Sequence, residues 1–133
     1  MATYLLDTNV CIRILNGTSD KVVARFASES RSRLRLCSVV KAELLYGARK
    51  SDRVAQVRGT LEKFFRPLPS VAFDDACAHE YGLIRADLAR AGTPIGTNDL
   101  MIAAIARHHD LTVVTHNIDE FTRVVGLAVE DWE

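Results

Sequence analysis

The sequence contains 133 residues, of which 48% are hydrophobic and 26% are charged, and its formal net charge is zero. This composition is typical of a globular protein with one hydrophobic core, so we expect residues 1–133 to form a single domain. It argues against a strongly basic nucleic-acid-binding protein, and no apolar run is long enough to predict a membrane span.

The charges are distributed unevenly along the chain. Residues 1–66 carry a net charge of +7 and residues 67–133 carry a net charge of −7, counting Lys, Arg, Asp and Glu. This asymmetry indicates either a basic face for an anionic partner or two halves that neutralise each other in the fold. Both interpretations remain open at this point.

The first half of the chain alternates apolar and amphipathic segments. A buried strand over 3–6 is followed by a helix over 8–16, which Gly17 ends. Ser19 or Asp20 is expected to cap a second helix over 20–27. A strand over 34–39 and helices over 39–50 and 52–65 follow, and Pro67 stops the last of them.

The second half continues the alternation. A weak strand over 68–73 precedes a long helix that begins at Asp74 or Asp75 and ends at Gly92. A strongly apolar helix over 97–109, a buried strand over 111–116, a short helix after Asn117 and a last strand over 127–132 complete the chain. Strands that alternate with helices predict an α/β fold with a parallel sheet.

The chain has three cysteines, and no two of them are close in sequence. Each lies among apolar residues, which predicts buried free thiols rather than disulfides or a zinc cluster. They are Cys11, Cys37 and Cys77. Free thiols favour a reducing cytoplasm, and the N-terminus lacks the basic and apolar regions of a secretory signal.

Asp7 directly follows the first predicted strand. Ligands of open parallel sheets gather outside the carboxyl ends of the strands, so Asp7 is a candidate site residue. The alternative is a helix N-cap, a position that Asp favours. Because Thr8 or Asn9 could cap the helix equally well, Asp7 is expected to be free for another role.

Two further carboxylates are expected at the same edge of the sheet. Glu43 lies about one turn into the helix after the second strand, although a solvated position beside Lys41 is the plainer interpretation. Asp99 lies in the first turn of a helix that Thr97 is expected to cap, where interaction with the helix dipole is the alternative.

Polar residues also follow the fourth predicted strand. Asn117 is expected to help coordinate a metal, directly or through water, whereas Asp119 and Glu120 are expected to serve helix entry. Carboxylates gathered at one edge repel each other and stay ionised together only around a cation. Oxygen ligands favour Mg²⁺ or Mn²⁺, which commonly meet phosphate oxygens, so the pattern indicates phosphate chemistry.

Four stretches now identify a resemblance: YLLDTN, VVKAELLYGA, IGTNDLMIAA and LTVVTHNIDEF. In this order and spacing they resemble the PIN domain and, within it, the VapC-type ribonuclease toxins of bacterial toxin–antitoxin pairs. The resemblance extends from Tyr4 to Trp132. It implies a three-layer α/β/α sandwich with a mostly parallel five-stranded sheet, and Mg²⁺-dependent endonucleolytic cleavage of structured RNA such as transfer RNA.

The resemblance also assigns the site. The family's first three acids map to Asp7, Glu43 and Asp99, and a fourth acid of many members falls at Asn117, whose neutral side chain argues against a permanent second metal. Asp7 and Asp99 are expected to hold Mg²⁺, which Mn²⁺ could replace, and Glu43 binds the ion or orients the attacking water. The expected supporting residues are Thr8, Asn9 and Thr115.

Partners follow from the same resemblance. The chain is expected to form a homodimer and to be held inactive by a small VapB-type antitoxin whose tail covers the active-site groove, in a heterotetramer or a larger complex. Arginines of the first half are candidates for contacts with the RNA backbone: Arg31, Arg33, Arg35, Arg49 and Arg53.

Two alternatives to a ribonuclease are compatible with acids at strand ends: an aspartyl-phosphate enzyme or phospho-receiver domain, and a binding module without catalysis. An aspartyl-phosphate enzyme would need a second acid two residues after Asp7, where Asn9 stands, and, like a phospho-receiver domain, a lysine near the later strands. All four lysines lie in the first half of the chain. A non-catalytic PIN-fold module that binds RNA or protein is the remaining alternative, and the polar strand ends argue mildly against it.

Overall fold

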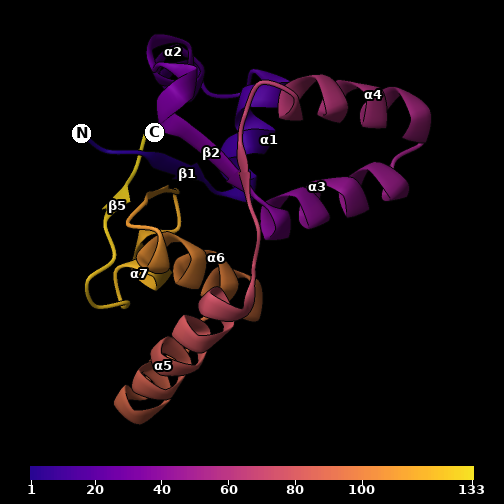
Figure 1. Ribbon diagram of the computed structural model, residues 1–133. Coiled ribbons are helices and arrows are strands. Elements are labelled where there is room, and N and C mark those ends of the chain that lie inside the picture. Colours follow the sequence, from indigo (N-terminus) through magenta and orange to yellow (C-terminus); the bar gives the residue numbers. More distant parts are fainter.

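The computed structural model describes residues 1–133 and contains a five-stranded, all-parallel sheet in the order β3-β2-β1-β4-β5 (Figure 1). The expectation of five strands in a parallel sheet is confirmed. The strands are β1 (Tyr4–Leu6), β2 (Leu34–Cys37), β3 (Ser70–Val71), β4 (Thr112–Val114) and β5 (Val129–Glu130).

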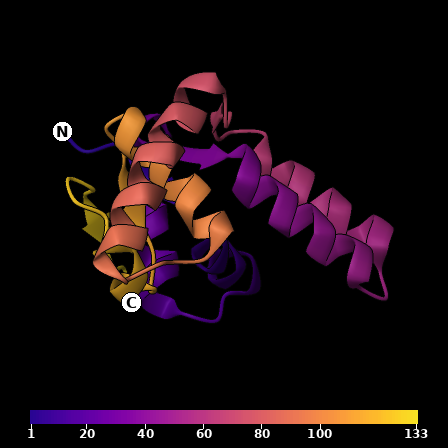
Figure 2. The same ribbon diagram turned by 90° about the horizontal axis from the view of Figure 1, so that it is seen from below.

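Helices cover both faces of this sheet. The chain adds β2 and β3 on one side of β1, and then crosses back to add β4 and β5 on the other side. Because crossovers between parallel strands are right-handed, this change of direction places the helices on both faces of the sheet. Figure 2 shows α5 and α6 in front of the sheet and α1 behind it. The first layer holds α1 (Thr8–Asn16), α2 (Asp20–Ser28), α3 (Ser38–Lys50) and α4 (Val54–Phe65). The second holds α5 (Asp75–Ala91), α6 (Thr97–His108) and α7 (Ile118–Phe121).

Most helix ends follow local sequence signals. Gly17 ends α1 in the left-handed conformation with φ 63°, which a residue without Cβ adopts readily. Of the alternatives left open by the sequence, Ser19 caps α2 by accepting a bond from the Val22 N–H, and Asp74 caps α5 by accepting one from the Cys77 N–H. Thr97 is the first residue of α6, and Gly96 takes the cap position expected for Thr97.

The second strand is shorter than expected. It ends at Cys37, and Ser38 and Val39, expected in the strand, form the first turn of α3. The apolar sequence continues past the end of the strand because Val39 and Val40 lie on the buried face of α3. The early start matters for the site because it places Glu43 in the second turn of α3.

A single cluster of 31 buried residues forms the core. The central strands are apolar throughout, and Leu5, Leu6 and Val114 have no exposed surface because helices cover both faces. The cysteines are free and buried, as expected. Burial raises the pKa of Cys37 to about 11, so its thiol stays protonated. None of the helices has the length and apolarity that a bilayer crossing requires.

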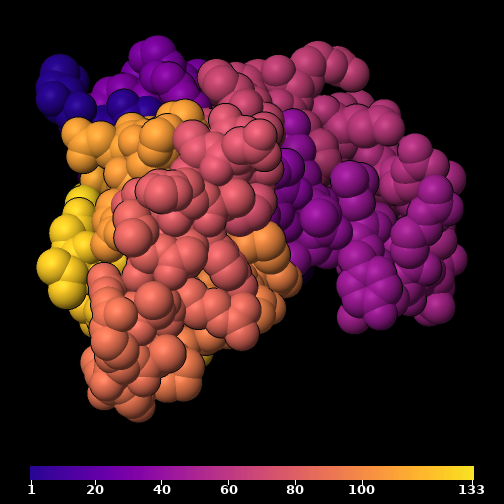
Figure 3. Space-filling model, turned by 60° about the horizontal axis from the view of Figure 1, so that its bottom comes forward, coloured from indigo at the N-terminus to yellow at the C-terminus, as the bar shows by residue number.

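The pair formed by α3 and α4 extends away from the sheet as a helical hairpin (Figures 1 and 2). In the space-filling view this hairpin forms a separate lobe beside the mass of α5 and α6, with a hollow between them (Figure 3). Glu43 lies in α3 near the base of the hairpin. The base of this hairpin therefore contributes to the site described next.

Candidate active site at the carboxyl edge of the sheet

Asp7 stands at the end of β1, beside β4, where the strand order reverses. It is the N-cap of α1, since its Oδ1 accepts a 2.8 Å bond from the Thr8 N–H. Thr8 and Asn9 are helical, so the expectation that one of them would replace Asp7 as the cap is wrong. The capping role leaves Oδ2 available, and this oxygen accepts a 2.8 Å bond from the Thr115 hydroxyl. Asp7 therefore both caps the helix and takes part in the site.

Glu43 approaches the same edge from α3. Its Oε1 accepts a 3.1 Å bond from the Thr8 hydroxyl, which joins residues 35 positions apart. Two adjacent residues thus connect the end of β1 to two other segments. Asp7 bonds to Thr115, just after β4, and Thr8 bonds to Glu43 in α3. Asn9, the other expected supporting residue, is exposed and its side chain forms no hydrogen bond.

Asp99 lies in the first turn of α6. Because α6 runs antiparallel to β4, its N-terminus lies at the carboxyl edge of the sheet with the other acids. Asp99 Oδ2 accepts a 3.2 Å bond from the Asn117 side-chain amide. The same amide donates a 2.8 Å bond to Glu120 Oε2, so Asn117 bridges two carboxylates and directs its nitrogen towards them.

Glu120 is the site residue that sequence reasoning missed. We expected it to serve only the entry of the short helix α7, but it contacts Asp99 and is bridged to it by Asn117. The signal was present in the spacing, since Asn117 and Glu120 are three residues apart around one helical turn. Thr115 supports this corner, because its hydroxyl oxygen accepts a 2.9 Å bond from the Asn117 N–H.

The carboxylates influence one another strongly. Burial, the hydrogen bond with Glu120 and the charges of Asp7, Glu120 and Glu43 together raise the pKa of Asp99 to about 7. The same hydrogen bond lowers the pKa of Glu120. Burial also raises the pKa of Asp7 against the lowering effect of the bonds from Thr115 and Thr8. Asp99 is therefore the carboxyl group that takes up a proton as the pH falls below neutral, which relieves the repulsion.

The donor set fits a hard divalent cation. Asp7, Glu43 and Asp99 form no ion pair with a lysine, arginine or histidine, so no protein cation balances their charge. Their oxygens do not form a closed group of three within 4.8 Å of one another. Such an open arrangement suits an ion that keeps several waters and binds through few carboxylates.

A second charged group lies farther along the same edge. His116 Nδ1 is 3.1 Å from Asp131 Oδ2 and 3.2 Å from Glu133 Oε2. Arg13 pairs with the other oxygen of Glu133 at 3.0 Å. These contacts tie the C-terminal residues to α1 and to the end of β4.

The five candidate arginines do not gather at the site. Arg31 and Arg33 lie just before β2, at the opposite edge of the sheet, where they donate to backbone carbonyls of Phe26 and Ala2. Arg35 donates to the carbonyls of its own segment. Arg49 and Arg53 are exposed near the tip of the α3–α4 hairpin and form no ion pair. The fold thus brings the predicted acids together but not the predicted arginines. Contact between these arginines and RNA stays a prediction.

Comparison with known proteins defines the class of this molecule. The PIN-domain family matches residues 4–127, so the chain belongs to the PIN-domain family. The sequence is 39% identical over 132 residues to the tRNA(fMet)-specific endonuclease VapC of Salmonella typhimurium, covering 99% of each chain. It is 36% identical over 131 residues to the ribonuclease VapC2 of Rickettsia felis, covering 98% of each chain. The expected VapC-type ribonuclease class is confirmed.

Solved structures agree with this assignment. DNA-bound VapBC from Salmonella typhimurium superposes with a TM-score of 0.92 at 39% identity and covers 100% of both chains. VapBC2 from Rickettsia felis, bound to a promoter DNA fragment, gives a TM-score of 0.90 at 34% identity and covers 98% of this chain and 99% of the other. The three-layer PIN-like fold is confirmed, and neither the aspartyl-phosphate enzyme nor the phospho-receiver domain remains a candidate.

Proposed function

We propose that this protein is a Mg²⁺-dependent endoribonuclease toxin of a type II toxin–antitoxin pair and that it cuts structured RNA at the carboxyl edge of its sheet. The observation that carries the proposal is the convergence of Asp7, Glu43, Asp99 and Glu120, acids from four elements, with no basic residue paired to the first three. The transfer-RNA specificity named for the Salmonella relative makes transfer RNA the first substrate to test.

The residues of the site have different proposed roles. Asp7 and Asp99 are the expected ligands of the ion, with Glu120 replacing Asn117 as the additional acid. The Thr115 hydroxyl donates to Asp7, and the Asn117 side-chain amide donates to both Asp99 and Glu120 and so fixes their relative positions. Glu43, fixed by Thr8, is placed to orient the attacking water or to bind the ion. A bound divalent cation would lower the pKa of water and stabilise charge on the leaving oxygen.

The partner assignment follows from the neighbouring structures, which are VapBC complexes. We propose that a VapB-type antitoxin binds this chain and restrains its activity, and that the toxin forms homodimers within a heterotetramer or a larger complex. Co-expression with a candidate antitoxin and light scattering of the purified complex would determine both compositions.

Metal removal tests the proposed activity directly. Purified protein is expected to cleave a transfer-RNA pool in Mg²⁺, to lose cleavage in excess EDTA and to regain it when Mg²⁺ or Mn²⁺ is restored, because the acids need a cation to act together. Gel analysis of end-labelled RNA measures the cuts. Undiminished cleavage in EDTA would contradict the metal assignment, and RNA binding without any cleavage would favour the non-catalytic module.

Glu120→Gln is expected to lower the cleavage rate by about 10-fold to 100-fold, a loss typical for a group that supports a metal ligand. The amide keeps an acceptor for the Asn117 side chain but removes the charge beside Asp99. Asp119→Asn is the matched control, because Asp119 is exposed one residue earlier in the same helix. Initial rates on one transfer RNA compare the variants, and equal losses would show that Glu120 has no special role.

A further inference from the structure

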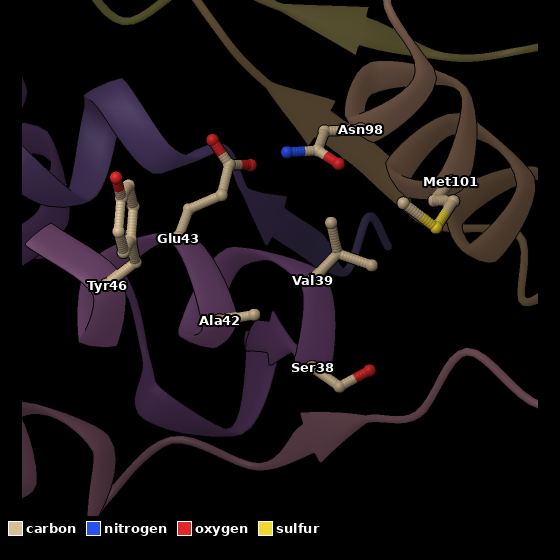
Figure 4. Close-up of a pocket in the computed structure, with 7 residues that line it drawn as sticks. All are labelled: Ser38, Val39, Ala42, Glu43, Tyr46, Asn98 and Met101. Atoms are coloured by element: carbon tan, nitrogen blue, oxygen red, sulfur yellow. The ribbon is translucent and has the colours of Figure 1, made fainter.

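A depression of about 420 Å³ lies between the first turns of α3 and α6. Its apolar lining comes from Val39, Ala42, Tyr46 and Met101, and polar groups of Glu43 and Asn98 stand at its margin (Figure 4). The volume falls within the ~300–1,000 Å³ typical of small-ligand pockets, which are mostly apolar with a few placed polar groups. The cavity is therefore large enough for a planar ring system.

This pocket is continuous with the candidate active site. Glu43 belongs to both, since it lines the pocket and accepts the bond from the Thr8 hydroxyl. Asn98 directly precedes Asp99 in α6. A phosphate held by the acids would thus have the pocket beside it.

Tyr46 is the unusual member of the lining. Its side chain is 64% exposed, and its hydroxyl forms no hydrogen bond within the protein. It lies three residues after Glu43, so both side chains extend from the same face of α3, as Figure 4 shows. The Lys50 ammonium lies 4.8 Å from the ring centroid, which brings a positive charge to the same surface.

We propose that the nucleotide next to the scissile phosphate places its base in this pocket, stacked on Tyr46 with its edge towards Asn98. Bases of unpaired RNA segments stack on aromatic side chains and are read along their edges, whereas paired bases are not free to do so. The Asn98 amide offers a donor and an acceptor, and forms no bond within the protein. Lys50 supplies a charge for the backbone.

The proposal rests on the proposed function and narrows it to a substrate class. The preferred cut lies in an unpaired loop, and the identity of one flanking base affects the rate. The apolar lining alone would also suit a protein surface. The free Asn98 amide and the nearby Lys50 ammonium favour a nucleotide, because they match the polar edge of a base and a phosphate, and Glu43 joins the pocket to the edge that is expected to hold the ion.

The first test uses RNA hairpins with randomised loops and sequencing of the cut ends. The wild-type protein is expected to favour one base beside the cut and to spare the same sequence in a duplex. Tyr46→Ala is expected to raise KM by about tenfold and to flatten the preference, with Tyr46→Phe close to wild type. Leu45→Ala is the matched control, since Leu45 is 40% exposed in the same helix and lies outside the pocket.

The second test needs no cleavage. The Asp7→Asn protein is mixed with a hairpin that carries 2-aminopurine beside the expected cut, whose fluorescence falls when the base stacks. Quenching that disappears when Tyr46→Ala is added to this protein supports the pocket, and quenching unaffected by Tyr46→Ala overturns it. Failure of the proposed function would instead appear as wild-type protein that cuts no hairpin, with the fluorescence result still decisive for the pocket.

Protein partners give a different result. If Tyr46→Ala converts a dimer to a monomer in sedimentation velocity and leaves the base preference and KM unchanged, the pocket receives a second copy of this chain and the base proposal is wrong. If the variant changes KM and base preference at an unchanged oligomeric state, the nucleotide is the occupant. Asn98→Ala should then reduce discrimination between bases by about tenfold.

Discussion

Asp7→Asn is expected to abolish RNA cleavage, with a loss on the order of 10³-fold or more, while the protein remains folded. Asp7 is the central acid of the site: it ends β1, contacts Thr115 and raises the pKa of Asp99 through its charge. The amide removes that charge and weakens cation binding, whereas its oxygen can still accept the bond from the Thr8 N–H. Cleavage of transfer RNA in Mg²⁺ measures the effect.

The choice of asparagine matters because Asp7 also caps α1. Asn and Asp are nearly equivalent caps, whereas alanine would cost about 1 kcal/mol of stability and would confuse the two roles. Asp74→Asn is the matched control, since Asp74 is also a helix N-cap but lies outside the site. Circular dichroism of both variants should match the wild type, and substantial cleavage by folded Asp7→Asn would show that the site is misplaced.

Asp99→Asn is expected to abolish cleavage and, at the same time, to stabilise the metal-free protein by about 1–2 kcal/mol at pH 8, after allowance for solvent screening of a half-buried group. Asp99 has its pKa raised to about 7 from the ordinary 3.8, chiefly by burial. The asparagine amide reproduces the protonated form, because it can accept from Asn117 and donate to Glu120.

The sign of the pH dependence follows from proton binding. Between about pH 4 and pH 7 the folded wild type holds a proton on Asp99 that the unfolded chain has released, so its stability falls as the pH rises through this range. The advantage of Asp99→Asn should therefore be present at pH 8 and vanish at pH 4. Urea unfolding in EDTA at both pH values measures it, and equal stabilities at pH 8 would contradict the proposed repulsion.

Mg²⁺ provides a further check on the same pair of proteins. The ion is expected to stabilise the wild type at pH 8 more than Asp99→Asn, because a ligand that binds the folded state adds stability that grows with the logarithm of its concentration divided by Kd. An equal increase in both would mean that Asp99 does not hold the ion.

Much of the fold was predictable because its signals are local. The apolar segments over 3–6, 34–39 and 111–116 predicted the three interior strands, and Gly17 and Gly92 marked two helix ends. The boundary between β2 and α3 was not, because buried valines suit a strand and a buried helix face alike. Thr97 was predicted to cap α6 because threonine is favoured at that position, whereas the chain uses Gly96.

The position of an acid at the carboxyl edge of the sheet was predictable where the residue follows a strand directly, as Asp7 does, or begins a helix at the strand ends, as Asp99 does. Glu120 was missed because its role depends on the approach of α7 to α6, which pattern alone does not reveal. The arginines show the opposite error. Charge counting found the basic half of the chain but could not place Arg31 and Arg33 at the far edge of the sheet.

The bond between Thr115 and Asp7 joins residues 108 positions apart, and β4 is an interior strand of the sheet, between β1 and β5. While the ribosome is still translating the last fifth of the message, the emerging polypeptide lacks this interior strand and every group contributed by α7. Under the proposed function, the nascent chain therefore lacks a complete catalytic centre beside the messenger RNA that encodes it. Ribonuclease activity is expected only when synthesis is nearly complete. Products of premature termination before Thr112 are expected to be harmless to the cell.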